Sequence, residues 1–282
     1  HTLLHLIRYK GENIRMAQLD KTYCEGWVQY LAHAKTIGTD VPKRGEHHEK
    51  DLAKGTARLY FNTFVTVLNE AVREGIIPKN PTKLLKKEER KMLSKQESKR
   101  CCLSIEEIKL LMVTPCKADT VKCAFLFACF CGLRLSDVRS LRWADIGKGT
   151  EGYYISKQMV KSRHVVTIPL SENALAWMPA RGQARVEDKV FSLPSYFSVN
   201  YRMKQWAREA GIEKPVTFHT SRHTFATTLL TMGVDLYTTS KLLGHQNITT
   251  TQVYAEIVNR KKVEAVSLLD QIKPPLGTLL GT

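Results

Sequence analysis

The stretch FHTSRHTFATTLLTMGVDLYTTSKLLGHQNITTTQVY, residues 218–254, decides how this chain is interpreted. His219 and Arg222 lie three residues apart in a helix-forming pattern, so both side chains leave the same helix face and can reach one phosphate together. His245 follows Gly244 in a helix-ending sequence, and Tyr254 comes nine residues later. Each residue alone has an ordinary structural explanation. Together they form a set that can bind a phosphodiester by charge and attack it with a tyrosine hydroxyl.

Charge and composition agree with that chemistry. The chain has 282 residues, a formal net charge of +16 and an isoelectric point near 9.6. Lysines and arginines in such excess favour a polyanionic partner, because neutralising phosphates releases counterions. No apolar run has the length of a membrane span and no signal peptide is evident, so we expect a soluble, cytoplasmic protein without a membrane partner. Seven cysteines without CxxC spacing predict reduced thiols that fill the core.

A charged segment divides the chain. KLLKKEERKMLSKQESKR, residues 83–100, carries eight basic and three acidic residues. We interpret residues 83–101 as a basic linker between a domain of residues 1–82 and a catalytic domain of residues 102–282. The charged end of a helix is the open alternative, because most of these residues form helices readily.

The first domain is predicted to be helical. Residues 17–35 and 51–77 have helical patterns, and Phe61, Phe64 and Leu68 fall on one face at spacings of three and four. Its outer faces carry basic side chains that either contact DNA or form an ordinary solvated surface. These candidates are Lys54, Arg58, Arg73 and Lys79.

The second domain begins with helices. Ser104 and Glu107 form a capping box that opens one helix. The apolar run of residues 123–131 predicts a buried helix that ends at Gly132. A further helix should follow, with Ser136 as its N-cap.

A hairpin and further helices complete the second domain. Residues 153–156 and 164–170 alternate in polarity and are rich in β-branched side chains, as the two strands of a hairpin are. Lys161 lies near the predicted tip. Residues 195–270 then read as a succession of helices. The predicted fold is therefore mainly α: a helical domain followed by a catalytic domain with one small antiparallel β-sheet.

Four motifs resemble those of the tyrosine recombinases of the phage integrase family. They are CGLRLSDVRSLRWADI at residues 131–146, KSRHVVTIPL at 161–170, HTSR at 219–222 and LLGHQNITTTQVY at 242–254. The similarity is strong over about residues 102–265, and the preceding domain more loosely resembles the family's SAM-like core-binding domain. The resemblance implies the DNA breaking-rejoining fold. It also implies the catalytic residues Arg134, Lys161, His219, Arg222, His245 and Tyr254, with Asp137 in support.

Within this resemblance, positively charged side chains bind the scissile phosphate. Arg134 and Arg222 would bind its nonbridging oxygens and stabilise the five-coordinate transition state. His219 and His245 would add hydrogen bonds to the same oxygens. Because the arginines supply the positive charge that a divalent ion would bring, we expect no metal and no cofactor.

The resemblance also assigns the proton transfers. Tyr254 would attack the phosphorus to give a 3′-phosphotyrosyl link, with His219 as a candidate acceptor of its proton. Lys161 would protonate the departing 5′ oxygen, and Lys157 could replace it if the hairpin register differs. Asp137 would orient the arginines. For His223, as for Lys157, contact with the DNA backbone is a further candidate role, and simple packing is the alternative.

Family membership implies partners and a biological role. We expect double-stranded DNA with a recombination site, a tetramer assembled on two such sites, and a possible host DNA-bending factor. The reaction would integrate or excise a mobile element, as in transposition, in a bacterial cytoplasm and on its nucleoid. Residues 259–272 and the apolar tail after them either pack on a neighbouring subunit or form a frayed end. Nothing resembling an arm-binding domain precedes the helical domain, so we expect a longer natural chain.

Three other readings compete. A metal-dependent hydrolase could use His219, His223 and His245, but Thr220 stands where a zinc peptidase motif places its glutamate. A catalytically silent DNA-binding or regulatory protein of the same fold would not need the complete set of catalytic residues. A type IB topoisomerase shares the chemistry but does not pair two sites.

Overall fold

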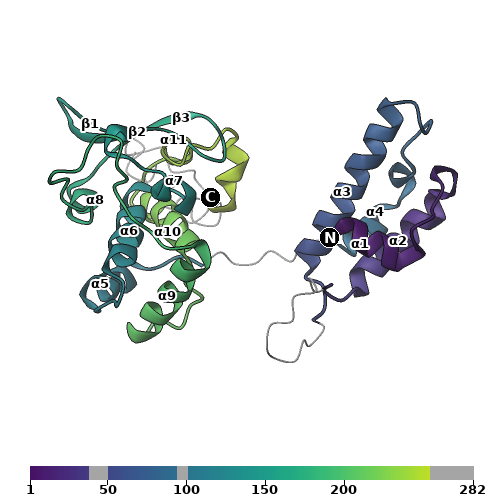
Figure 1. The fold of residues 1–282 in the computed structure, drawn as a ribbon, viewed down its shortest axis with the longest axis horizontal. Coiled ribbons are helices and arrows are strands. Elements are labelled where there is room, and N and C mark those ends of the chain that lie inside the picture. The colour runs from purple at the N-terminus through teal and green to yellow at the C-terminus, as the bar shows by residue number, and fades with distance from the viewer. Residues whose placement is uncertain (38–49, 94–100, 255–282) are drawn as a thin grey trace, which may run out of the picture. The chain divides into compact units, whose positions relative to one another are not determined.

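The computed structural model describes residues 1–37, 50–93 and 101–254, and the chain divides into two compact units, His1–Lys99 and Arg100–Thr282 (Figure 1). The boundary falls inside the segment predicted to separate two domains. The seven cysteines are free thiols; Cys24, Cys129 and Cys131 are buried, and the other four are half-buried. Within the described ranges, no helix combines the length and the apolar character needed to cross a membrane.

The described part of the first unit is built from helices. They are α1 (Thr2–Lys10), η1 (Met16–Gln18), α2 (Lys21–His33), α3 (Lys54–Arg73), η2 (Pro81–Leu84) and α4 (Lys87–Lys91). Helix α2 begins where the Asp20 carboxylate accepts the N–H of Tyr23 at 2.7 Å. Helix α3 buries Phe61, Phe64 and Leu68 at the predicted spacing. These side chains and the fully buried Trp27 of α2 belong to the core of this unit. The sequence predicted helices in the regions of α2 and α3 but did not predict α1.

The segment predicted as a linker is partly folded into the first unit. Leu85 and Leu93 are buried in its core, with exposed fractions of 5% and 2%. Between them, Arg90 of α4 donates hydrogen bonds to the carbonyl oxygens of Thr82 at 2.9 Å and Lys83 at 3.1 Å. The prediction of a linker is therefore wrong for residues 83–93, because two leucines among many charges are enough to anchor a short helix. Residues 94–100 lie outside the described residues.

The second unit holds the remaining described elements. Its helices are α5 (Ile105–Val113), α6 (Asp119–Cys131), α7 (Leu135–Arg139), η3 (Trp143–Asp145), α8 (Glu172–Ala176), α9 (Tyr196–Glu209), α10 (Phe218–Thr231), α11 (Leu236–Leu242), η4 (Ile248–Thr250) and η5 (Gln252–Tyr254). Its strands are β1 (Ile146–Gly149), β2 (Gly152–Gln158) and β3 (Val165–Pro169). The predicted capping box opens α5, where the Ser104 hydroxyl accepts the N–H of Glu107 at 3.2 Å.

Helix α6 is the core of the second unit. It lies against α8, α9 and α10 and beside α10 in Figure 1. Phe125, in the middle of α6, contacts Trp206 of α9 and Phe218 of α10 edge to face, at ring distances of 6.0 and 5.9 Å. Apolar residues around the whole helix are buried, as the run without periodicity predicted. This packing fixes α10 beside α6.

The three strands form one antiparallel sheet in the order β1-β2-β3. Ile155 of β2 pairs with Ile146 on one side and with Ile168 on the other. Ile155 and Ile168 are buried in the core of this unit. The predicted hairpin corresponds to β2 and β3, and β1 was not predicted because its sequence, IGKG, has too few apolar residues to show a pattern.

Candidate active site

Arg222 lies at the centre of the candidate site, on helix α10. Its side chain is only 3% exposed. The guanidinium donates to the carbonyl oxygens of Gly132 at 2.8 Å and Leu243 at 2.6 Å, and it contacts Nε2 of His245 at 2.8 Å. One side chain therefore joins the end of α6, the end of α11 and the loop that carries His245.

Arg134 reaches this centre through a turn that glycine makes possible. Gly132 ends α6 with a φ of 71°, and a Cβ there would lie 2.5 Å from the ring of Phe225. The chain then turns so that Arg134, and not Ser136 as predicted, is the N-cap residue of α7. Nη1 of Arg134 is buried and has no hydrogen-bond partner within the described ranges.

The two arginines influence each other. Burial, and then the positive charge of Arg134, lower the pKa of Arg222 from 12.5 to about 9. Two guanidinium groups that lie close together in a largely buried site repel each other. One of them, Arg134, also has a buried N–H donor that no acceptor among the described residues satisfies. An anion bound between them would satisfy that donor and remove the repulsion. A phosphate fits these requirements because its oxygens accept paired hydrogen bonds from guanidinium groups.

Asp137 anchors the hairpin that carries Lys161. Its carboxylate is fully buried, and Oδ1 accepts the N–H of Val160 at 2.8 Å in the turn between β2 and β3. Lys161 directly follows Val160 and is exposed. The negative charge of Asp137 also raises the pKa of Arg222, although less than burial and Arg134 lower it. The sequence predicted a role in orienting the arginines; the hydrogen bond to the hairpin was not anticipated.

The hairpin has a second contact, with the loop after α11. The side chain of Gln246 contacts that of His164, and it also donates to the carbonyl oxygen of Ser162 at 3.5 Å. Gly244, with a φ of 63°, brings this loop close, since a Cβ there would lie 2.7 Å from Val166 of β3. The turn with Lys161 is therefore held from two sides.

His245 links Arg222 to the segment before the tyrosine. Its Nε2 lies 2.8 Å from Arg222 and its Nδ1 lies 2.8 Å from the hydroxyl of Thr251. Because a guanidinium only donates, Nε2 must accept, and this favours the neutral ring with its proton on Nδ1. Thr251 is buried and was not singled out from the sequence.

Tyr254 lies in the same cluster of side chains. It is 7% exposed and packs with Phe225 and Leu243. Its hydroxyl is 2.6 Å from Nδ1 of His223, and the ring of His223 meets that of His219 edge to face at 4.6 Å. His219 itself is exposed. The phenol also acts electrostatically on Arg222, whose pKa it raises.

Lys157 has a different role from the one predicted. It is 8% exposed, and its amine lies 2.9 Å from Asp145 and donates to the carbonyl oxygen of Ser140, also at 2.9 Å. A buried lysine held in this way is not available as a DNA contact or as a substitute for Lys161, so both suggestions are corrected. The cause is the strand register, which turns Lys157 toward η3 and leaves Lys161 in the turn.

The zinc alternative can be compared with the same contacts. His223 is bonded to the tyrosine hydroxyl and His245 to Arg222, so the three histidines do not converge. Within residues 1–37, 50–93 and 101–254, no group of three His, Cys, Asp or Glu side chains could hold a metal ion.

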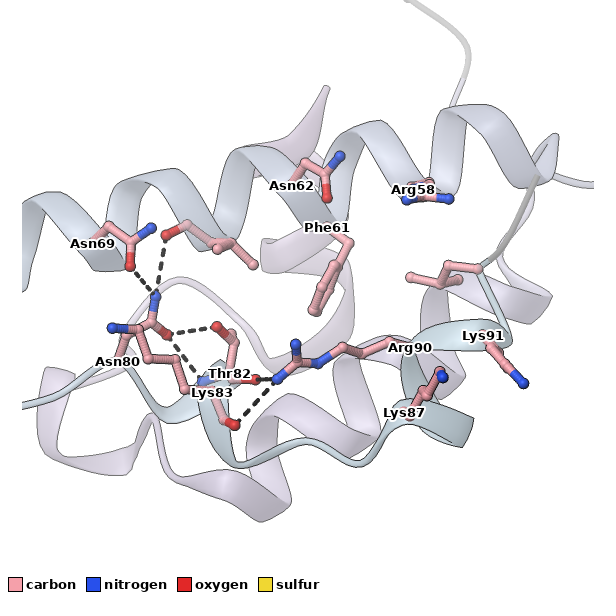
Figure 2. A pocket seen from close by; sticks show the side chains of 12 residues that line it. Arg58, Phe61, Asn62, Asn69, Asn80, Thr82, Lys83, Lys87, Arg90 and Lys91 are labelled. Atoms are coloured by element: carbon pink, nitrogen blue, oxygen red, sulfur yellow. Dashed lines mark hydrogen bonds between the residues drawn. The ribbon is translucent and has the colours of Figure 1, made fainter. Parts of the chain in front are cut away.

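A basic surface, separate from the candidate active site, lies on the first unit. Figure 2 shows a hollow with Arg58, Asn62 and Asn69 of α3 on one side and the short helix α4 on the other. Four more basic residues line it: Lys83, Lys87, Arg90 and Lys91. Of the DNA contacts predicted in this unit, only Arg58 lines the hollow. The other basic residues were missed because they were assigned to a linker.

The remaining predicted contacts of the first unit lie outside this hollow. Lys54, Arg73 and Lys79 are exposed. Arg73 forms an ion pair with Glu70 one turn earlier on α3. Their contact with DNA stays a prediction.

Comparison with known sequences agrees with these observations. Residues 102–260 match the Phage integrase family, and residues 1–90 match the Phage integrase SAM-like domain. A tyrosine recombinase of Pseudothermotoga lettingae is 34% identical over 147 residues, which is 50% of this chain and 51% of that protein. Tyrosine recombinase XerD of Proteus mirabilis is 31% identical over 195 residues, 62% of this chain and 59% of that protein. The chain thus spans about half the length of the curated relatives it matches.

Solved structures share the fold at low sequence identity. A lambda integrase fragment, solved as a dimer bound to a COC′ core site, has a TM-score of 0.66 and 17% identity, covering 90% of this chain and 85% of that one. The Tn1549 transposon integrase, in complex with circular intermediate DNA, has a TM-score of 0.64 and 18% identity, with coverages of 90% and 86%. The mainly helical fold with a small antiparallel sheet is therefore confirmed. With both of its parts matched by family sequences, this chain belongs to the phage integrase family.

Proposed function

We propose that this protein is a site-specific recombinase that cuts and rejoins DNA through a 3′-phosphotyrosyl intermediate, without a metal or ATP. The observation that carries the proposal is the pair of guanidinium groups beside the tyrosine. Arg222 is buried and bonded to two carbonyl oxygens, Arg134 keeps a buried donor without a partner in the described part of the chain, and Tyr254 interacts electrostatically with Arg222. Such a site would bind a phosphate and present a hydroxyl nucleophile to it.

In the reaction, a phosphoryl group of the DNA would be transferred from the 5′ oxygen to Tyr254 and later returned to a 5′ oxygen. Tyr254 attacks the phosphorus, the bond to the 5′ oxygen breaks, and Lys161 on the turn gives that oxygen a proton. Arg134 and Arg222 stabilise the negative charge of the transition state, and His219 adds a hydrogen bond. His245, whose ring nitrogens contact Arg222 and Thr251, would hold Arg222 in position instead of donating to the phosphate. The phosphotyrosyl bond conserves the energy of the phosphodiester, so religation by a 5′ hydroxyl needs no nucleotide cofactor.

The partner would be double-stranded DNA with a recombination site. Arg58, Lys87 and Lys91 line the hollow of the first unit. These positive charges support binding of the hollow to the phosphates of the DNA backbone. The Tn1549 and lambda integrases named above were solved with DNA, and by analogy this protein would integrate or excise a mobile element. A tetramer on two sites, a host DNA-bending factor and a bacterial cytoplasmic location belong to the same proposal.

Covalent trapping tests the reaction class. The protein is incubated with nicked duplexes taken from the DNA that flanks its gene, denatured, and examined for a DNA-linked band. The band should form with the wild type and not with Tyr254→Phe, the matched control that lacks one oxygen atom. If wild type binds these duplexes without forming the adduct, and Arg134 and Arg222 substitutions change nothing, a catalytically silent DNA-binding protein of this fold is the better description.

A further inference from the structure

We propose that His223, rather than His219, accepts the proton of Tyr254 during cleavage. This inference rests on the proposed function and assigns a further catalytic residue to the same site. From the sequence His223 was a candidate DNA contact, a packing residue or, in the metal-dependent alternative, a zinc ligand, and the family motifs quoted above do not assign it a role. In the structure, Nδ1 of His223 lies 2.6 Å from the hydroxyl oxygen of Tyr254.

The distance suits direct proton transfer. A general base must lie about 2.6–3.2 Å from the atom that gives up the proton, and His223 satisfies this before any substrate is bound. The guanidinium groups of Arg134 and Arg222 cannot replace it as acceptors, because they have only donors. Imidazole is also the side chain whose ordinary pKa is suited to exchanging a proton near neutral pH.

The position of His223 is fixed by its surroundings. It follows Arg222 on α10, so the residue that binds the phosphate and the residue that takes the proton are carried by one rigid helix. It is half-buried, while His219, one helical turn earlier, is exposed. The two rings meet edge to face at 4.6 Å. His219 therefore borders His223 from the open side of the site, where a hydrogen bond to a phosphate oxygen suits it better than contact with the phenol.

Cleavage involves two separate proton transfers. The O–H bond of Tyr254 breaks and its proton goes to Nδ1 of His223, while the phenol oxygen bonds to phosphorus and the bond from phosphorus to the 5′ oxygen breaks. The 5′ oxygen takes a separate proton from Lys161. On religation the 5′ hydroxyl returns its proton to Lys161 as it attacks, and His223 returns the other to the leaving tyrosine. The proposal requires neutral His223 to carry its proton on Nε2.

Two DNA substrates that differ only in the leaving atom, oxygen or sulfur, distinguish the two proton transfers. A duplex with sulfur in place of the bridging 5′ oxygen releases a thiolate, which leaves without a proton. Single-turnover cleavage by His223→Asn and His223→Leu should fall by about 10²-fold or more on both duplexes, in the range expected for loss of a general base. Lys161→Met should be slow on the oxygen duplex and restored on the sulfur duplex. Mobility shifts would show that each variant still binds DNA.

The paired substitutions make the result decisive. Asn can keep a hydrogen bond near the Nδ1 position but cannot take a proton, so wild-type cleavage by His223→Asn would overturn the proposal. So would rescue of the His223 variants by sulfur, or a defect in His219→Asn that the His223 variants lack.

Nitrogen NMR of the DNA-free protein tests the contact even if no cleavage is found. The ring of His223 should have its proton on Nε2, and Tyr254→Phe should shift its Nδ1 signal; a proton on Nδ1 would contradict the proposal. If the wild type forms no phosphotyrosyl adduct at all, the proposed function fails, and the NMR result still decides whether Nδ1 of His223 accepts from Tyr254.

Discussion

The basic hollow of the first unit and the candidate active site of the second unit differ in how far their positive charges are exposed to solvent. Lys87 and Lys91 in the first unit are exposed, whereas Arg222 in the second unit is 3% exposed and bonded to two carbonyl oxygens. Exposed charges attract phosphates over a distance and are screened by salt, while buried charges keep their position and interact more strongly. In the proposed reaction, the first unit would provide affinity for DNA and the second would place one phosphate.

The buried site contains a second contrast, between its two arginines. Arg222 is part of the architecture, because it joins α6, α11 and the loop of His245. Arg134 has a buried Nη1 that lacks a partner within the described residues. One arginine therefore holds the site together and the other is left for the ligand, and substitutions should separate these two roles.

The largest effect is expected from Arg222→Lys. Lysine keeps the charge, but its single nitrogen cannot occupy the separate positions from which Nη1 and Nη2 bond Gly132, Leu243 and His245, so cleavage should fall by about 10³-fold. The free energy of unfolding should also fall, by about 2–3 kcal/mol, because buried carbonyl oxygens lose their donors. Single-turnover cleavage and urea denaturation measure the two quantities. Unchanged stability would show that Arg222 does not hold the site together.

Arg134→Met should sharpen the contrast. Methionine keeps the apolar stem but removes the charge, so cleavage should fall by about 10²–10³-fold. Stability should stay the same or rise by up to about 1 kcal/mol, because the repulsion between the guanidinium groups is gone. The same two assays apply. A loss of stability as large as that of Arg222→Lys would mean that both arginines are structural.

A smaller effect is expected from Asp137→Ala, which removes the acceptor for the N–H of Val160. The turn with Lys161 should lose its position, and we expect cleavage to fall by about 10-fold, which is less than the roughly 10²-fold or more expected for removal of a general acid, because Lys161 itself is still present. A sulfur leaving group should restore the rate, since it does not need Lys161. Asp137→Asn, which keeps an acceptor oxygen, is the matched control and should lose less. An equal loss of cleavage rate on the oxygen and sulfur substrates would show that Asp137 acts by orienting the arginines and not by positioning Lys161.

Residue spacing predicted the local arrangement of the candidate site, but it did not predict contacts between distant segments. Arg222 and His219 could be placed on one helix because a spacing of three residues fixes their relative direction. The contact of His223 with Tyr254 could not be predicted, because 31 residues separate them and the path between is set by the packing of α10, α11 and η5. Local spacing carries no information about such a closure.

The failures have a common physical cause. Lys157 and Lys161 look equivalent in the sequence, and only the pairing of β2 with β3 decides which one is buried against Asp145 and which lies in the turn. Leu85 and Leu93 did not change the prediction of a linker, because the surrounding charges dominate any average over the segment, although burial depends on the individual side chain. Tertiary packing settles both cases.

Lys157→Met tests the first of these corrections. The ion pair with Asp145 is mostly buried, so its loss should lower the free energy of unfolding by about 1–3 kcal/mol. Affinity for DNA should not change, because the amine is bonded within the protein. Denaturation and mobility-shift assays measure these quantities. A weaker complex with unchanged stability would restore Lys157 as a DNA contact.

The smallest effect is expected from Lys87→Gln combined with Lys91→Gln, in the hollow of the first unit. Each phosphate contact contributes about 0.9 to the slope of log affinity against log salt, so losing two should reduce the slope by about 2. Cleavage of DNA that is already bound should be unchanged, since these lysines do not belong to the candidate active site. Arg73→Gln is the control, because its side chain pairs with Glu70 outside the hollow. If Arg73→Gln reduces the slope as much as the double variant, affinity arises from the general charge of the first unit, and the hollow has no special role.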